Sequence, residues 1–574
     1  MFRKNRRTQQ PLLINDLTQL PARSRKILEK SWAGTFRQEV FQRIDETPFA
    51  VLYDAGPSRP NEPVNVFVAL DILKHWRGWS DEELYEHFLF DLQVRYAVGC
   101  DTLAEDNFDL RTLYYFRQRV SAYGLKTGQN LFQTVFQQLT DQQLEKLALK
   151  TGWQRMDSTQ LASNIANLSR LELLVRLLQR LHMLLSAADQ AQYADLFAPY
   201  LREGAGQYVY RIKGKDETRA QLQQTGEQLY RLLTALGDTY AAEPLWAVAG
   251  RFFDENFKLV EQAVQTKTNT EITAGCLQSL DDLDATYRCK ANQAYKGYVA
   301  NVSETCDPAN PVQLIDLVQV APNQVSDIHL LKDAVPELTE RLHTEQLVTD
   351  GGYVSPQIDA LLHDQGIEQL PTNLVGTDPD HTNGHLAVSD FTLHLDAQDT
   401  LTQCLCPAQQ AATIVPTASG KAYRLVFAVQ TCLSCAFYQH HQCPVRINPR
   451  QTQANLPLPK ERVLSAVRRQ RFETTKQAAR KLRPAVEATM FHLQIGFPKG
   501  RLRVRGLWRV TCAVVCAALA VNLRRIHRYL QIQVKAMAGK VGLGAASQLA
   551  NSFFRWLWAV LTGSTTPFQT CFGC

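Results

Sequence analysis

Three acidic residues, far apart in the chain, have settings in which a carboxylate could bind a metal ion. Asp157 follows a semi-apolar run in RMDSTQLASNI (155–165), and Asp350 follows another in LVTDGGY (347–353). Glu487 lies in KLRPAVEATMFHLQIGF (481–497), at the margin of an apolar helical stripe. Mg²⁺ prefers oxygen ligands, and two such ions roughly 3.5–4 Å apart promote phosphoryl transfer. These residue types therefore suit metal-dependent chemistry on a phosphodiester.

Each acidic residue also has a simpler explanation. Asp157 is followed by Ser158 and Thr159, which fit a turn at the end of a strand. Asp350 precedes Gly351 and Gly352, a routine turn sequence that would also leave the carboxylate open to a metal. Glu487 alone fits a solvated helix face, and Pro484 before it fits either the start of a helix or a kink. The surrounding strands and helices must show whether these residues are metal ligands or have the simpler explanation.

An alternation of strands and helices positions the two aspartates. Two β-branched, alternating runs, KGYVANVSETC (296–306) and VQLIDLVQVAP (312–322), are followed by a predicted helix, a strand at 345–350, a second helix and a short apolar run. With a first strand ending at Asp157, this order predicts a mixed α/β layer that has a large helical insert after strand one.

The rest of the chain divides around this layer. We expect a helical N-terminal DNA-binding domain at 1–145, which is either a plain bundle or a helix-turn-helix-like DNA reader. The catalytic core would comprise 146–164 and 285–400, with a helical insertion at 165–284. A small Cys-rich insertion would follow at 401–460, and a helical part of the core carrying Glu487 at 461–574.

Composition limits the compartment and the partners. The 574 residues are 45% hydrophobic and 21% charged, with a net charge of only +6, as in ordinary globular proteins. The start of the chain shows no sustained apolar signal region, and the thirteen cysteines fit a reducing cytoplasm. The apolar stretch 511–523 is too short to span a bilayer, so we expect a buried core helix and no membrane partner.

Five cysteines gather within the predicted insertion: Cys404, Cys406, Cys432, Cys435 and Cys443. One Cys-x-x-Cys pair is present, and a four-thiolate zinc site would stabilise a small strand-rich insert. We take Cys406, Cys432, Cys435 and Cys443 as the candidate zinc ligands; the alternative is reduced, unliganded thiols.

Basic residues surround Glu487. Between Lys460 and Arg505 there are 13 Lys or Arg against 3 Asp or Glu. This density suits the DNA backbone, whereas a solvated helix face would carry more balancing acids. The candidate DNA-binding residues are Arg480, Lys481, Arg483, Arg501, Arg503 and Arg505.

These motifs, in this order, resemble a DDE transposase of a bacterial insertion sequence. The similar segments are MDSTQL, TDGGY, Arg483 with Val486-Glu487, RLRVRGLWRV and AVNLRRI, together with the N-terminal helices. The family signature around the glutamate is Tyr, two residues, Arg, three residues, Glu, six residues, Lys. This chain keeps Arg483 and Glu487 but has Arg480 in the Tyr position and Gln494 in the Lys position.

The resemblance implies a ribonuclease H-like core in which Asp157, Asp350 and Glu487 hold two Mg²⁺ or Mn²⁺ ions. It implies cleavage and strand transfer at the ends of an insertion sequence, with double-stranded DNA (terminal inverted repeats and target) as partner. A homodimer or higher assembly on DNA, in the bacterial cytoplasm at the nucleoid, would follow. The alternatives are a transposase-derived DNA-binding protein without catalysis, and a ribonuclease H-like nuclease acting on other nucleic acids.

Overall fold

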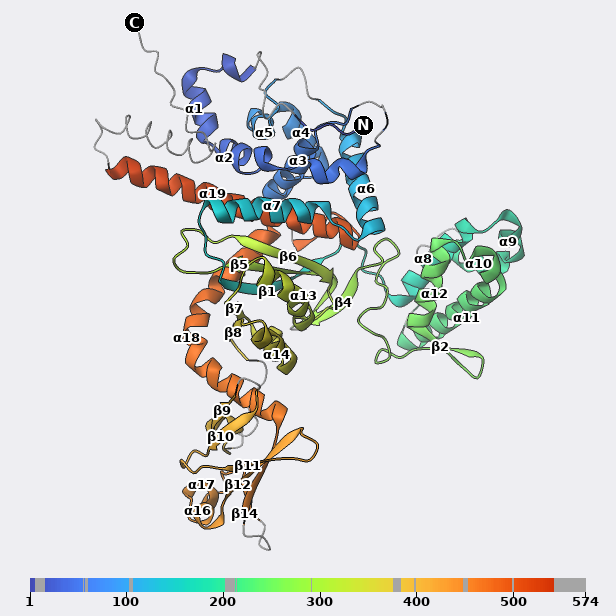
Figure 1. Cartoon of the computed structure of the whole chain (residues 1–574). Helices are drawn as coiled ribbons and strands as arrows, with labels where there is room; N and C mark the ends of the chain where they lie inside the picture. Colours follow the sequence, from blue (N-terminus) through green and yellow to red (C-terminus); the bar gives the residue numbers. More distant parts are fainter. Residues whose placement is uncertain are drawn as a thin grey trace.

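The chain is a mixed α/β protein in which a curled sheet lies between two sets of helices (Figure 1). The computed structural model describes all residues except 6–15, 55, 57–59, 103–106, 202–211, 213, 291, 375–383, 397–398, 448–452, 498–499 and 541–574. The side chains of residues 18, 476, 478–480, 483 and 537–540 are also outside the description.

The N-terminal part is helical, and its helices begin at polar caps. Ser80 caps one of them, because its Oγ accepts a hydrogen bond from the Glu83 backbone N–H at 3.1 Å while Glu83 Oε2 accepts from the Ser80 N–H at 2.6 Å. Ser80 and Glu83 thus form the predicted capping box. The helices are α1 (Ala22–Lys30), α2 (Trp32–Glu39), α3 (Val64–Arg77), α4 (Asp81–Phe90), α5 (Leu92–Ala97), α6 (Leu110–Thr127) and α7 (Leu131–Lys146), with short 3₁₀ turns at Asp16–Gln19, Phe41–Arg43 and Thr47–Leu52.

The central sheet has six strands: β1 (Trp153–Ala162), β4 (Thr286–Lys290), β5 (Gln293–Thr305), β6 (Ile315–Pro322), β7 (Gln346–Thr349) and β8 (Glu368–Pro371). β1 pairs antiparallel with β5 and parallel with β7, β7 pairs parallel with β8, and β6 and β4 both pair antiparallel with β5. The predicted order of strands and helices is therefore confirmed, and β4 forms in the DATYRCK stretch, which the family resemblance indicates as a strand region.

Helices cover both faces of this sheet. On one face, α13 (Asp327–Glu340) and α14 (Pro356–Asp364) bury apolar residues that include Met156, Leu317 and Leu347. On the other face, α3, α7 and the C-terminal helix α19 (Leu507–Lys540) share one core with Ala300 and Val302 of β5. A sheet buried on both faces explains the near-continuous apolar runs of β5 and β6.

The helical insertion after β1 has a core of its own. It contains α8 (Arg170–Leu184), α9 (Ala187–Gln192), α10 (Ala194–Leu201), α11 (Lys215–Tyr240), α12 (Pro244–Asn256) and a hairpin, β2 (Phe257–Val260) with β3 (Ala263–Thr266), that the sequence did not predict. Its buried leucines and aromatics form a cluster separate from the main core, and Figure 1 shows the insertion beside the central sheet.

The Cys-rich insertion forms two small sheets and starts earlier than the predicted residue 401. β9 (Thr392–Leu395) pairs with β10 (Leu401–Leu405), and a four-stranded sheet follows, built from β11 (Thr413–Pro416), β12 (Ala422–Ala428), β13 (Arg446–Ile447) and β14 (Gln453–Pro459). Two short helices, α16 (Val429–Leu433) and α17 (Ala436–Gln439), carry the Cys-x-x-Cys pair. β9 needs β10 as its partner, which moves the boundary toward the N-terminus.

Two long helices complete the chain. α18 (Lys460–Gln494) runs from the small sheet to the central sheet, so Pro484 lies inside it and a helix start at Pro484 is ruled out (Figure 1). α19 is much longer than the apolar stretch 511–523, and its part Leu507–Ala536 is long and apolar enough to cross a membrane. About 67% of its most apolar window is nevertheless buried inside the protein, as in the predicted core helix.

Asp316 on β6 is a fully buried acid. Its Oδ2 accepts a hydrogen bond from Gln154 Nε2 at 2.7 Å, and within the described part of the chain its buried Oδ1 has no hydrogen-bond partner. Burial disfavours the carboxylate and raises the pKa of Asp316 to about 7. Between about pH 4 and about pH 7, Asp316 therefore carries a proton in the native state that it has lost in the unfolded chain.

This pKa predicts how stability depends on pH. Because the native state binds more protons, stability should fall as the pH rises from about 4 to about 7. Asp316→Asn removes the ionisation, so its unfolding temperature relative to the unmodified protein should be higher at pH 8 than at pH 5. Thermal unfolding at both pH values checks this, and an equal difference at the two would contradict it.

Candidate active site on adjacent parallel strands

Asp157 lies in the middle of β1, so the prediction that the strand ends there is wrong. β5 is long enough to pair with β1 from Gln154 to Ala162, with Asp157 opposite Val302, and this ladder carries the strand past Ser158 and Thr159. What does end near Asp157 is the pairing with β7, whose last partner in β1 is Arg155. The half-buried carboxylate of Asp157 thus lies where one neighbouring strand leaves the sheet.

Asp350 follows β7 directly, just beyond the residue pairs that join β7 to β1. That parallel ladder ends with Arg155 opposite Val348, so Asp157 and Asp350 each lie two residues past its last pair, and the backbone of Asp350 is still extended. Val348, two residues before Asp350, packs against Leu482 of α18.

A hydrogen-bonded group of polar side chains surrounds these aspartates. The Ser158 N–H donates to Asp157 Oδ1 at 2.8 Å, and Ser158 Oγ donates to Asp327 Oδ1 at 2.7 Å. Asp350 Oδ1 accepts from the Gly352 N–H at 2.7 Å. A Cβ at Gly352 would lie 3.0 Å from oxygens of both Asp327 and Asp350, so those oxygens are no farther apart than twice that distance.

Three carboxylates lie close enough to Tyr353 to affect its ionisation. Burial, and then the charges of Asp327, Asp157 and Asp350, raise the pKa of this buried phenol well above its usual value. The sequence reasoning missed Asp327 because an Asp in the first turn of a helix, directly after a Ser cap, is adequately explained by the helix dipole.

α18 is hydrogen-bonded to β1 at two points. Near its middle, the Leu482 carbonyl accepts a hydrogen bond from Arg155 Nη1 at 3.4 Å. At its end, Gln494 Nε2 donates to Thr159 Oγ1 at 2.7 Å. Gln494 stands where the family signature has Lys, and in this chain it makes a contact within the protein.

Asp157 and Glu487 both lie between these two points. Asp157 is between Arg155 and Thr159 on the same face of β1, and Glu487 is exposed on α18 between Leu482 and Gln494. Among the residues that the structure describes, no three His, Cys, Asp or Glu side chains are arranged to hold a metal ion. The three predicted ligands therefore do not form a metal site within the described part of the chain, although Asp157 and Glu487 belong to elements that are bonded to each other.

The predicted DNA-binding residues differ in their surroundings. Lys481 and Arg503 are exposed. Arg501 and Arg505 are also exposed, but their guanidinium groups donate hydrogen bonds of 2.6 and 2.7 Å to the carbonyls of residues 165 and 164, just after β1. They thus tie the segment after α18 to the strand that carries Asp157. The side chains of Arg480 and Arg483 lie outside the described residues.

The four candidate zinc ligands share one region of the small sheet. Cys432 and Cys435 flank a tight turn, in which the Cys435 N–H donates to the Cys432 carbonyl at 3.2 Å, and Cys406 Sγ accepts from the Gln410 N–H at 3.4 Å. Burial, and then the nearby thiols of Cys443, Cys406 and Cys435, raise the pKa of Cys432 to about 11. Cys404 is fully buried in the core of this sheet, against which Cys406, Cys432 and Cys443 pack.

A family of known proteins matches the part of the chain that contains Glu487. Residues 405–527 match the family model of the transposase DDE domain. The match begins at the end of β10 and includes the four cysteines and α18 with Glu487. Both aspartates precede the matched residues and lie outside them. No curated protein and no solved structure matches the chain. The transposase DDE domain match supports a transposase-type function.

A buried ion cluster next to this site was not predicted. It contains Glu304 of β5, Arg155 of β1 and Arg525 of α19. A carboxylate inside a strand as apolar as β5 was the available signal, because a buried charge needs a partner. The partners come from distant parts of the chain, so the sequence could not name them.

Proposed function

We propose that the protein is a DDE transposase of a bacterial insertion sequence, with the central sheet as its ribonuclease H-like core. It would cleave DNA at the ends of the element with water as nucleophile and join the strands to target DNA through a 3′-hydroxyl. The observation that carries the proposal is the placement of Asp157 and Asp350 on adjacent parallel strands, under a helix that carries Glu487 and belongs to the segment matching the transposase DDE domain.

The donor atoms suit Mg²⁺ or Mn²⁺. Asp157, Asp350 and Glu487 offer only carboxylate oxygens, which are hard ligands, and no cysteine or histidine intervenes in the set. Two bound divalent ions would activate the attacking oxygen and stabilise the leaving oxygen. Asp157 would contact both ions, with Asp350 and Glu487 contacting one each. Their carboxylates must converge on binding, and the side chain of Glu487 is exposed to solvent.

The surroundings support these roles. The Ser158 N–H donates to one oxygen of Asp157, and the Gly352 N–H donates to one oxygen of Asp350, so backbone groups orient both carboxylates. Lys481 and Arg503 are exposed near α18 and offer charge to DNA phosphates. A homodimer or larger assembly on paired element ends completes the proposal.

Mapping of cleavage products tests the proposal. The protein is incubated with DNA that carries the ends of its element, with Mg²⁺ or with EDTA, and the cut positions are determined. Cuts at the element ends that require Mg²⁺ support a transposase. Binding without any cut would favour a transposase-derived DNA-binding protein, and cleavage without preference for the ends would favour a ribonuclease H-like nuclease.

We also propose that Cys406, Cys432, Cys435 and Cys443 hold a structural zinc ion. The turn between Cys432 and Cys435 and the backbone N–H bonded to Cys406 Sγ are features that support thiolate ligands. The small sheet has its own buried cluster, and a metal bound at its edge would add to its stability.

Metal analysis of the purified protein tests the zinc proposal. We expect about one zinc ion per chain in the unmodified protein, because a four-thiolate site binds a single ion. Cys432→Ser should lose it, whereas Cys289→Ser, at an exposed cysteine outside the cluster, should retain it. An unmodified protein that contains no zinc would remove the proposal.

A further inference from the structure

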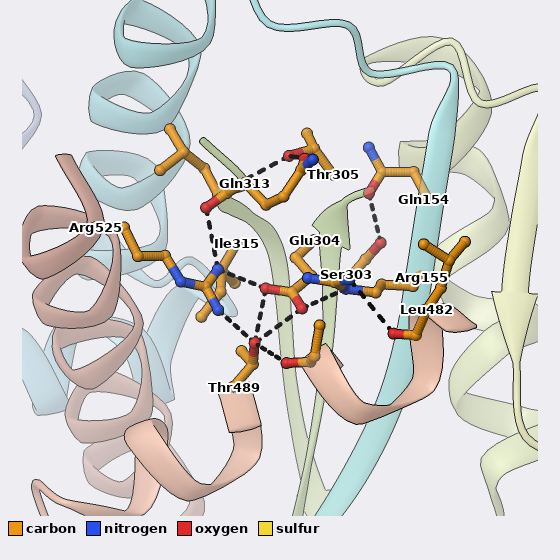
Figure 2. Close-up of polar contacts among 12 residues, drawn as sticks. Gln154, Arg155, Ser303, Glu304, Thr305, Gln313, Ile315, Leu482, Thr489 and Arg525 are labelled. Atoms are coloured by element: carbon orange, nitrogen blue, oxygen red, sulfur yellow. Dashed lines mark hydrogen bonds and ion pairs between the residues drawn. The ribbon is translucent and has the colours of Figure 1, made fainter. Parts of the chain in front are cut away.

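A buried ion cluster joins four elements beside the candidate active site (Figure 2). Glu304 of β5 is fully buried; its Oε1 accepts a hydrogen bond from Arg155 Nε at 2.6 Å, and its Oε2 accepts from Arg525 Nη1 at 2.5 Å. Thr489 of α18 places its Oγ1 2.8 Å from Oε1 and 2.9 Å from Oε2, and Arg525 also donates to this hydroxyl. Strands β1 and β5 are thereby bonded to helices α18 and α19.

The cluster is close in sequence to two of the predicted ligands. Arg155 is two residues before Asp157, and Thr489 is two residues after Glu487. Arg155 also donates to the Leu482 carbonyl, which precedes Glu487 on α18. A further bond, between Thr159 and Gln494, joins the two elements after both ligands.

Directional bonds of this kind specify a register. A shift of α18 by one residue would turn Thr489 by about 100° around the helix axis, and Glu304 would lose its hydroxyl partner. Apolar residues of similar volume would hold the helix to the sheet as well as a buried ion pair does, so stability alone gives no reason for these charges. A need for fixed geometry does give a reason for these charges, because charge-assisted bonds to a carboxylate are short and oriented.

We infer that Glu304, Arg155, Arg525 and Thr489 are positioning residues that keep the helix bearing Glu487 in register with the strand bearing Asp157. The inference rests on the proposed function, in which both carboxylates face the same pair of ions. Ligands of such a site must be held within about 0.5 Å of the productive geometry. None of the four positioning residues needs to touch the ions or the DNA for this role.

Fe²⁺ used as a probe tests the inference without DNA. Fe²⁺ takes oxygen ligands and, with ascorbate and peroxide, cuts a polypeptide close to where it is bound. In the unmodified full-length protein we expect cuts near residues 157, 350 and 487. Thr489→Val keeps the shape of the side chain but removes the hydroxyl, so the cut near 487 should be lost while those near 157 and 350 persist. Thr489→Ser keeps the hydroxyl and should keep all three.

The outcomes separate the two proposals. An unchanged cut near 487 in Thr489→Val would overturn the positioning role and leave the metal site intact. Absence of cuts near 157 and 350 in the unmodified protein would overturn the proposed function and this inference with it. If Thr489→Val does not fold, Thr489→Ala decides, because it removes the same hydroxyl without placing an additional methyl group beside Glu304; an unchanged cut near 487 in that variant would equally contradict the positioning role.

Discussion

Asp157→Asn should reduce Mg²⁺-dependent cleavage at the element ends by about 10²–10³-fold or more, the loss seen when one main stabiliser of transition-state charge is removed. The asparagine has nearly the same size and still offers an oxygen to the Ser158 N–H, so β1 should keep its pairing with β5. What disappears is the negative charge beside Asp350. Cleavage is measured on labelled element ends, and DNA binding is measured on the same DNA.

Binding separates this effect from misfolding. Affinity for DNA depends mainly on contacts between basic side chains and phosphates, and Asp157→Asn removes none of them. Asp333→Asn, on the exposed side of α13, is the matched control and should leave cleavage unchanged. Cleavage by Asp157→Asn at the rate of this control would show that Asp157 is not a metal ligand. Asp350→Ala and Glu487→Ala should behave as Asp157→Asn does.

Local sequence patterns predicted the order of the elements correctly, for a physical reason. Strands β5 and β6 carry β-branched residues in alternating runs, which are typical of strands, and α13 begins at a Ser cap that any such helix would use. The end of a strand is harder to predict. Ser158 and Thr159 have turn-like chemistry, but pairing with distant β5 continues β1 through them.

The sequence could not show which side chains contact one another in the site, because those contacts are tertiary. Asp327 comes near Asp350 only because α13 begins over the edge where β7 ends. Gln494 was evaluated as a departure from a family signature, yet its hydrogen bond to Thr159 gives it a place in the fold. The sequence left open whether Pro484 starts a helix or lies inside one, since Pro484 fits either position; α18 begins at Lys460 and continues through it.

The largest effect on stability should come from Glu304→Ala. The substitution leaves the guanidinium groups of Arg155 and Arg525 without their carboxylate in a buried site, and breaking a buried pair in this way costs about 3–5 kcal/mol. Hydrogen exchange of the β1 and β5 amides measures this locally, which matters in a chain with several cores. Exchange should accelerate by a factor of at least about 10², because each 1.4 kcal/mol corresponds to tenfold.

Two further variants show what the charges contribute. Asp281→Ala breaks the exposed pair with Arg180 and should cost about 1 kcal/mol or less, so exchange in the central sheet should stay as it is. Replacing Glu304, Arg155 and Arg525 together by Met removes the buried charges as a set and should recover most of the stability lost in Glu304→Ala. Recovered stability without recovered cleavage would separate the two roles, since apolar packing restores cohesion between α18 and β1 but supplies no directional bond to fix their register. Recovery of both would mean that cohesion alone places Glu487.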